Sequence, residues 1–120
     1  MGDFKDLIVF QKSYKLAMDI FETSKKFPPE EKYSLIDQIR RSSRSVCTNL
    51  AEGYRKRRYP AYFISKVSDA ESENTETQIW IEFSHDCKYL SVDLYNDFTI
   101  RNSEVGKILW TILKNPEKFL

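Results

Sequence analysis

The stretch SVCTNLAEGYRKRR, at residues 45–58, joins small polar side chains, two apolar side chains at helical spacing and a run of four cations. Successive residues of a helix lie about 100° apart, which places Val46 and Leu50 on one face. Ile39, upstream in QIRRSSR, continues that face. The spacing therefore predicts a helix that extends from about residue 31 to at least residue 52 and packs its apolar side in a helical bundle.

Gly53, in the middle of this stretch, has two interpretations. A glycine often ends a helix in the left-handed conformation, which would leave YRKRR as a basic connector. A glycine inside a helix that continues to about Arg57 would instead let a neighbouring helix approach closely. Pro60 supplies a stop a few residues later, so we favour continuation and keep both alternatives open.

Three further helices are predicted from apolar side chains that recur at spacings of three and four residues. Their predicted ranges are about 3–26, 60–90 and 98–115. Because the connections between the helices are short, neighbouring helices should be antiparallel. We therefore predict an all-α fold, an antiparallel up-down-up-down four-helix bundle, as one domain over residues 1–120.

The composition indicates a soluble helical protein, because 41% of the residues are hydrophobic, 31% are charged and only 3 are glycine. Charges interrupt the first turns of the chain, so we expect no secretory signal. No run approaches the roughly 18 apolar residues of a membrane span. We therefore expect a cytoplasmic protein with no membrane contact, in which Cys47 and Cys87 are buried, inert thiols.

The charges are unevenly distributed, although the net charge is only +1. Residues 31–59 carry eight cations and three anions, whereas residues 60–90 carry two cations and six anions. On a helical projection the arginines form an outward stripe, which the basic end of the stretch extends. Such a stripe is a solvated face, a partner for the acidic helix or a contact for nucleic acid. The candidate nucleic-acid contacts are Arg40, Arg41, Arg44, Arg55, Lys56, Arg57 and Arg58.

The first helix carries two apolar lines that point in different directions. The expected bundle seam consists of Leu7, Phe10, Tyr14, Ala17 and Phe21. A second apolar face on a bundle helix predicts self-association. The candidate interface on that face consists of Val9, Leu16 and Ile20. A flank of polar side chains on the second helix is suited to close contact with another helix or another subunit, and it consists of Ser45, Asn49 and Glu52.

The sequence contains none of the usual catalytic constellations. Glycines at positions 2, 53 and 106 are too far apart to form a phosphate-binding loop. His85 is the sole histidine, and the E-x-x-H element of metal sites in helical bundles is absent. Polar residues of the third helix, Asn74 and Gln78 among them, are expected to fix helix register through buried hydrogen bonds. We therefore expect no enzymatic activity, no metal and no cofactor.

Several blocks of the chain resemble one protein family, in the same order. QIRRSSRSVCTNLAEG at residues 38–53 is similar to the Q-I-R-R-A-x-x-S-I-x-x-N-I-A-E-G signature of the four-helix-bundle proteins encoded in 23S ribosomal RNA intervening sequences. Further blocks that resemble the family are FKDLIVFQ at 4–11, FPPEEKYSL at 27–35, ENTETQIWIEF at 73–83 and NPEKF at 115–119. The resemblance implies an antiparallel four-helix bundle that assembles into a ring, typically a pentamer.

The resemblance also bears on partners. Members of the family are described as ribosomal or intervening-sequence proteins of unknown function. A related branch serves as the accessory protein of diversity-generating retroelements, where a basic ring binds nucleic acid and a reverse transcriptase. This chain departs from that branch because it is nearly neutral, and it has Ser42 where the signature has a small apolar residue.

Two hypotheses for the function follow. In the first, the protein is a non-enzymatic homo-oligomer that acts as an accessory or adaptor protein. Its seven candidate cations bind RNA or DNA weakly, with an affinity that falls as salt rises. In the second, the chain is purely a protein–protein module, and its basic helix meets the acidic helix of a neighbouring subunit or another partner.

Overall fold

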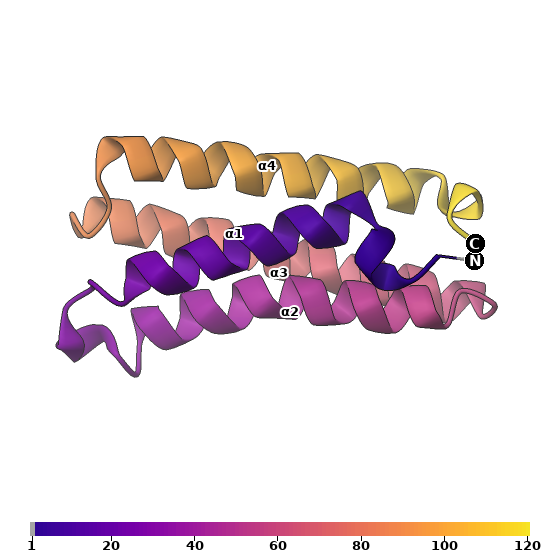
Figure 1. Ribbon diagram of the computed structural model, residues 1–120, viewed down its shortest axis with the longest axis horizontal. Coiled ribbons are helices and arrows are strands. Elements are labelled where there is room, and N and C mark those ends of the chain that lie inside the picture. Colours follow the sequence, from indigo (N-terminus) through magenta and orange to yellow (C-terminus); the bar gives the residue numbers. More distant parts are fainter. Residues whose placement is uncertain (1) are drawn as a thin grey trace.

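The computed structural model of the protein describes residues 2–120 and consists mainly of four long helices (Figure 1). The long helices are α1, Ile8–Ser24; α2, Leu35–Arg55; α3, Pro60–Asp86; and α4, Val92–Lys114. Three 3-10 helices accompany them: η1, Phe4–Asp6; η2, Pro29–Glu31; and η3, Pro116–Lys118. Residues 2–120 contain no strand, so the all-α prediction is confirmed.

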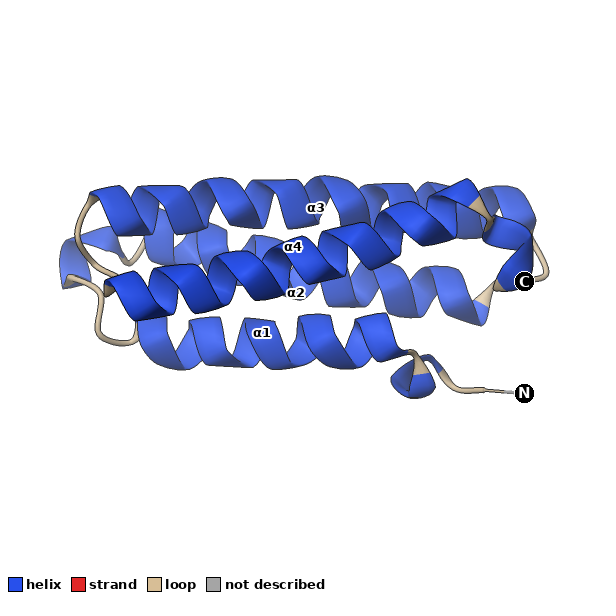
Figure 2. Ribbon diagram, turned by 90° about the horizontal axis from the view of Figure 1, so that it is seen from above, coloured by secondary structure: helices blue, strands red, loops and turns tan. Residues whose placement is uncertain are grey.

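Consecutive helices run antiparallel, which gives the predicted up-down-up-down order (Figure 1). Each helix contacts the next one along the chain, and α1 also lies against α4, which closes the bundle. The molecule measures 44 × 24 × 20 Å. The α2–α3 turn, η1 and η3 lie at one end, and the α1–α2 and α3–α4 connections lie at the other (Figures 1 and 2). Within the described part of the chain, no helix is long and apolar enough to cross a membrane.

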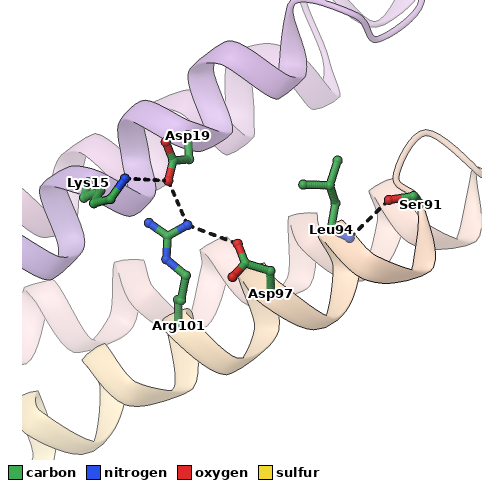
Figure 3. Close-up of polar contacts among 6 residues, drawn as sticks. All are labelled: Lys15, Asp19, Ser91, Leu94, Asp97 and Arg101. Atoms are coloured by element: carbon green, nitrogen blue, oxygen red, sulfur yellow. Dashed lines mark hydrogen bonds and ion pairs between the residues drawn. The ribbon is translucent and has the colours of Figure 1, made fainter.

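Arg101 links α4 to α1 on the outside of the bundle (Figure 3). Its Nη1 lies 2.8 Å from Asp19 Oδ2 on α1 and 3.1 Å from Asp97 Oδ2 on α4. Lys15 Nζ approaches the same Asp19 oxygen at 3.4 Å. Ion pairs that are open to solvent contribute about 1 kcal/mol or less each, so this group adds little to the stability of the bundle.

The end of α3 and the start of α4 differ from the predicted ones because of the residues at the helix ends. α4 begins at Val92, earlier than predicted, since the Ser91 hydroxyl caps it by accepting the Leu94 N–H at 3.1 Å (Figure 3). α3 ends at Asp86, also earlier than predicted. Lys88 adopts a left-handed φ of 67°, which turns the chain out of the helix.

The first two long helices, α1 and α2, begin later in the sequence than predicted. Leu7 is extended, with ψ of 125°, and separates η1 from α1, so the first predicted helix is interrupted. The Asp3 N–H donates to Asp6 Oδ2 at 3.0 Å and closes η1 as a separate turn. α2 begins at Leu35 because Pro29, at the first position of η2, starts a short helix of its own.

α2 continues through Gly53 and ends at Arg55, so the continuation that we favoured is correct, although the helix stops two residues before Arg57. Gly53 does not have a positive φ. A Cβ atom placed on it would lie 2.9 Å from the Cβ of Lys66 and 3.5 Å from the carbonyl oxygen of Phe63. The glycine therefore allows α2 and α3 to pack closely.

The core consists of two apolar clusters with buried polar side chains between them. The cluster near the α2–α3 turn consists of Val9, Val46, Leu50, Phe63, Val67, Ala70, Val105, Leu109 and Ile112. The other cluster consists of Leu16, Ile20, Phe27, Leu35, Ile36, Ile39, Ile81, Leu90 and Phe98. Between them, Asn74 Nδ2 donates to Asn102 Oδ1 at 2.8 Å, and Asn102 Nδ2 donates to the Asn74 carbonyl at 3.0 Å and to Gln78 Oε1 at 3.2 Å. The hydrogen bonds predicted for Asn74 and Gln78 are therefore present.

The apolar line on α1 that was expected to mediate self-association is part of the core. That line consists of Val9, Leu16 and Ile20, each at most 3% exposed. In the expected seam only Ala17 is buried, and Tyr14 is 54% exposed. The prediction of Val9, Leu16 and Ile20 as an interface is therefore wrong. Periodicity gives the directions of two apolar lines, but it does not say which of them the neighbouring helices cover.

The two cysteines differ in environment. Cys47 is buried as expected, and its Sγ lies 3.4 Å from Ser13 Oγ. Burial raises the pKa of the Cys47 thiol, which keeps it protonated and unreactive at neutral pH. Cys87 is exposed just after the end of α3, so the expectation that it is buried is wrong.

Candidate nucleic-acid interface

The seven candidate cations form two separate groups. Arg40, Arg41 and Arg44 lie in the middle of α2. The other group, which we call the basic end, consists of Arg55, Lys56, Arg57 and Arg58, at the last turn of α2 and the connection to α3. At about 1.5 Å per residue, roughly 16 Å of helix separates the two groups. The sequence predicted one continuous outward stripe of cations, whereas the structure has two separate groups.

Arg40 does not face outward, and this part of the prediction is wrong. Its Nε donates to Ser24 Oγ at 2.8 Å, and its Nη2 donates to the Phe21 carbonyl at 3.4 Å. The guanidinium also lies over the Phe21 ring, 4.6 Å from the ring centre. Because Phe21 and Ser24 belong to the last turn of α1, Arg40 places its charge at the negative end of that helix.

Arg41 and Arg44 are both exposed. Arg41 Nη1 lies 3.7 Å from Asp37 Oδ2, one turn earlier on α2. On α3, burial raises the pKa of the Glu73 carboxyl and neighbouring Glu76 raises it further, while Arg41 lowers it. Arg41 therefore lies between acidic groups of both helices. Arg44 lies over the Phe21 ring, 5.3 Å from the ring centre.

The basic end is interleaved with tyrosines. The Arg57 guanidinium lies 3.6 Å from the centre of the Tyr54 ring. Lys56 Nζ lies 5.0 Å from the centre of the Tyr62 ring. Each of these distances is within the range of a cation–π interaction. The two contacts hold Lys56 and Arg57 against neighbouring rings.

The basic end lines an open depression of about 790 Å³, which we call the arginine pocket. Its lining residues are Gly2, Arg55, Arg57, Arg58, Pro60 and Leu120. A second depression of about 400 Å³ shares Arg55 and Arg57 with it and adds Asp3 and Tyr54. Three guanidinium groups at one concave surface favour an anionic ligand, and they favour it more in the arginine pocket, because Asp3 lines only the second depression.

The tyrosines were not among the predicted site residues. The sequence does contain a signal for them, because in YRKRRYPAY at residues 54–62 tyrosines flank the run of four cations on both sides. The prediction of a basic site uses only the charges of this run. The tyrosines become significant only when the α2–α3 turn brings Tyr54, Tyr59 and Tyr62 to the same end of the bundle.

The polar flank of α2 contacts α3 of the same chain. Asn49 Nδ2 donates to the Ser45 carbonyl at 2.9 Å and to Ser45 Oγ at 3.2 Å. Lys66 Nζ donates to Asn49 Oδ1 at 3.5 Å and lies 3.4 Å from Glu52 Oε2. For Ser45, Asn49 and Glu52 we predicted contact with another helix or with another subunit. The structure shows the contact with another helix, α3.

The residues that could suggest chemistry elsewhere are dispersed. The His85 ring stacks on Tyr95, with the ring centres 4.0 Å apart, and its Nδ1 is buried without a hydrogen-bond partner. Across residues 2–120, no group of three or more His, Cys, Asp or Glu side chains is placed to hold a metal ion. The basic end, where three arginines line one depression, is therefore the candidate functional site.

Comparisons with known proteins agree with the resemblance found in the sequence. The family described as 23S rRNA-intervening sequence protein matches residues 5–111. A solved structure of a protein with unknown function from the S23 ribosomal protein family of Bacteroides thetaiotaomicron VPI-5482 is similar, with a TM-score of 0.82 and 29% sequence identity. The similarity covers 92% of this chain and 99% of that chain. Among curated proteins, none matches this chain.

Proposed function

Since the chain belongs to the 23S rRNA-intervening sequence protein family, we propose that it is a non-enzymatic, homo-oligomeric accessory protein that binds RNA or DNA through its basic end. The observation that carries this proposal is the arginine pocket, where Arg55, Arg57 and Arg58 line one concave surface. Arg41 and Arg44 provide additional exposed charge along α2. Arg40 takes no part, because its guanidinium is bound to α1.

The chemistry of arginine suits this role. A guanidinium offers five N–H donors in a planar fork, which matches the oxygens of a phosphate group. Binding of cations to phosphates releases condensed counterions, so affinity falls steeply as salt concentration rises. The net charge of the chain is only +1, so the attraction is local to the basic end, and we expect weak binding.

Self-association into a ring, with five subunits, is part of the proposal. Large apolar side chains remain exposed on the outside of the bundle, among them Ile8 on α1 and Ile100 and Trp110 on α4, and Ile100 is 68% exposed. Covering them with a second copy would remove apolar area from water. Light scattering should give a mass of several subunits, and a mass of 14.3 kDa, that of a single chain, would contradict this part of the proposal.

Nucleic-acid binding is tested by fluorescence anisotropy with labelled mixed-sequence RNA and DNA at several salt concentrations. The proposal predicts binding at about 50 mM salt that weakens markedly by about 200 mM, because released counterions oppose binding. Absence of binding at about 50 mM salt, or binding that is insensitive to salt, would contradict it. In an accessory role, the protein would present nucleic acid to a partner such as a reverse transcriptase.

A further inference from the structure

The basic end combines two features that different forms of nucleic acid use differently. Its arginines suit phosphates of any strand. Its tyrosines suit only bases that are not already paired and stacked, because an aromatic ring stacks on the face of a base. In a duplex those faces are occupied by neighbouring base pairs. An exposed aromatic ring beside the cations would therefore favour a single strand over a duplex.

Tyr59 is the best-placed of these rings. It precedes Pro60 at the start of α3, and 55% of it is exposed. The Arg58 guanidinium lies 5.3 Å from the centre of its ring, so cation and ring are adjacent. Both neighbours of Tyr59 in the chain, Arg58 and Pro60, line the arginine pocket. Tyr59 itself does not line the pocket, but the Arg58 contact places its ring beside a lining residue, so a base attached to a phosphate at Arg58 would lie next to the ring.

The shape of the basic end also favours a single strand. The arginine pocket measures about 790 Å³ and lies at one end of a bundle that is only 24 × 20 Å in cross-section. Proteins bind small organic ligands in pockets of about 300–1,000 Å³, so this pocket suits a nucleotide more than a duplex. The four cations also lie within one short turn of chain, whereas a duplex presents its phosphates along a stiff, extended backbone.

We propose that the arginine pocket binds single-stranded nucleic acid, with the phosphates held by Arg55 and Arg58 and an unpaired base stacked on Tyr59. This inference rests on the proposed function and specifies its ligand. Arg57, held against Tyr54, completes the cationic lining. The smaller depression, which Asp3 lines, does not hold the phosphate, because a carboxylate repels it.

Anisotropy with a fluorescein-labelled 12-nucleotide single strand, and with the same strand annealed to its complement, tests the inference. The wild-type chain should bind the single strand about tenfold more tightly at the same salt concentration, because one stacked base contributes ~1–3 kcal/mol. Tyr59→Ala and Tyr59→Leu should each weaken single-strand binding about 5- to 150-fold, which corresponds to the ~1–3 kcal/mol of one stacked base. Tyr59→Phe keeps the ring and should bind as the wild type does.

Tyr33→Ala is the matched control, because Tyr33 is 85% exposed at the other end of the bundle and also has a lysine, Lys32, over its ring at 5.3 Å. It should leave binding unchanged. Tyr59 makes no side-chain cap for α3, so its substitution should leave the helical circular dichroism intact. Equal or tighter binding of the duplex, or normal binding by both Tyr59→Ala and Tyr59→Leu, would overturn the inference alone. Failure of the wild type to bind either form would overturn the proposed function as well.

Discussion

The Arg57 guanidinium lies 3.6 Å from the centre of the Tyr54 ring, and this contact joins the α2–α3 turn to the last turn of α2. A run of four cations in a sequence usually indicates a solvated segment whose side chains move independently. Here neighbouring tyrosine rings restrict that freedom for Lys56, Arg57 and Arg58. Groups that are held in place before binding lose less conformational entropy when a ligand arrives, which favours affinity from only a few charges.

Arg40→Ala should lower the stability of the protein without changing its affinity for nucleic acid. Arg40 donates to Ser24 Oγ at 2.8 Å and lies over the Phe21 ring. We expect a loss of about 1–2 kcal/mol in the free energy of unfolding, measured by urea denaturation, because a charge-assisted hydrogen bond and a cation–π contact are removed.

Anisotropy of Arg40→Ala with labelled RNA should match the wild type. A clear loss of affinity in a folded Arg40→Ala protein would show that Arg40 reaches the ligand after all. Arg40→Lys should recover only part of the stability, because an ammonium group cannot reproduce the planar contact with Phe21.

Gly53→Ala should destabilise the protein, although alanine is normally the better helix former by about 0.5–1 kcal/mol. The added Cβ would lie 2.9 Å from the Cβ of Lys66, an atom that cannot move without the backbone of α3. Overpacking of this kind costs about 1–3 kcal/mol, which exceeds the gain in propensity. Urea denaturation should therefore give a net loss. Stabilisation of Gly53→Ala would mean that the helices separate easily at this point.

The Asn74–Asn102 pair should show strong energetic coupling. Each side chain is buried and donates to the other residue. Asn102→Ala leaves the Asn74 amide without its side-chain acceptor, which should cost about 1–3 kcal/mol. A double-mutant cycle with Asn74→Ala and Asn102→Ala should give a coupling energy of at least about 0.5 kcal/mol. Asn96→Ala, at an exposed position of α4, is the control. If the losses of unfolding free energy caused by the two buried substitutions simply add, the hydrogen bonds between Asn74 and Asn102 do not couple the two residues, which would contradict the prediction.

The Tyr89–Glu31 hydrogen bond predicts a specific pH dependence of stability. The Tyr89 hydroxyl donates to Glu31 Oε2 at 2.9 Å. Hydrogen bonds from Ser34 and from Tyr89 lower the pKa of Glu31 below its ordinary value of 4.5. The contribution of a group with a lowered pKa is present above its unfolded pKa and is lost as pH falls through its folded pKa.

Tyr89 sets the upper end of the pH range over which this hydrogen bond stabilises the protein. The bond to Glu31 raises the pKa of Tyr89 to about 12, so its contribution is present below the ordinary pKa of 10.0 and is lost as pH rises towards 12. The stability difference between wild type and Tyr89→Phe should therefore be largest between about pH 5 and 10 and should shrink at both extremes. A difference that does not change with pH would contradict the contact.

Helix periodicity was enough to predict the four helices, and the short connections between them were enough to predict their antiparallel order, because periodicity and connection length can both be read from local sequence. Periodicity could not choose between the two apolar lines of α1, since both Val9 and Phe10 belong to apolar stripes and only tertiary packing decides which stripe is covered. Helix ends were missed where a polar cap such as Ser91 starts α4 ahead of the apolar seam.

The candidate site was predicted in part for a similar reason. The cations of the basic end were identified from composition, whereas the position of Arg40 depends on the ring and carbonyl of Phe21, a residue far away in the sequence. The role proposed for Tyr59 depends on the pocket that Arg55 and Leu120 line together. The spacing of residues along one helix does not predict that two residues so far apart in the sequence lie close in space.

The most direct test of nucleic-acid binding by the basic end compares two triple variants with the same change in charge. Arg55→Ala, Lys56→Ala and Arg58→Ala together remove three exposed cations of the basic end, whereas Lys25→Ala, Lys26→Ala and Lys32→Ala remove three exposed cations near the opposite end. The slope of the logarithm of affinity against that of salt concentration changes by about 0.7 for each lost contact with a single-strand phosphate. We predict that the first variant loses most of its affinity and about 1.4 units of slope for the Arg55 and Arg58 contacts, or about 2 if Lys56 also meets a phosphate, while the second stays close to the wild type. Equal losses in both variants would show a nonspecific effect of net charge and would contradict a binding site at the basic end.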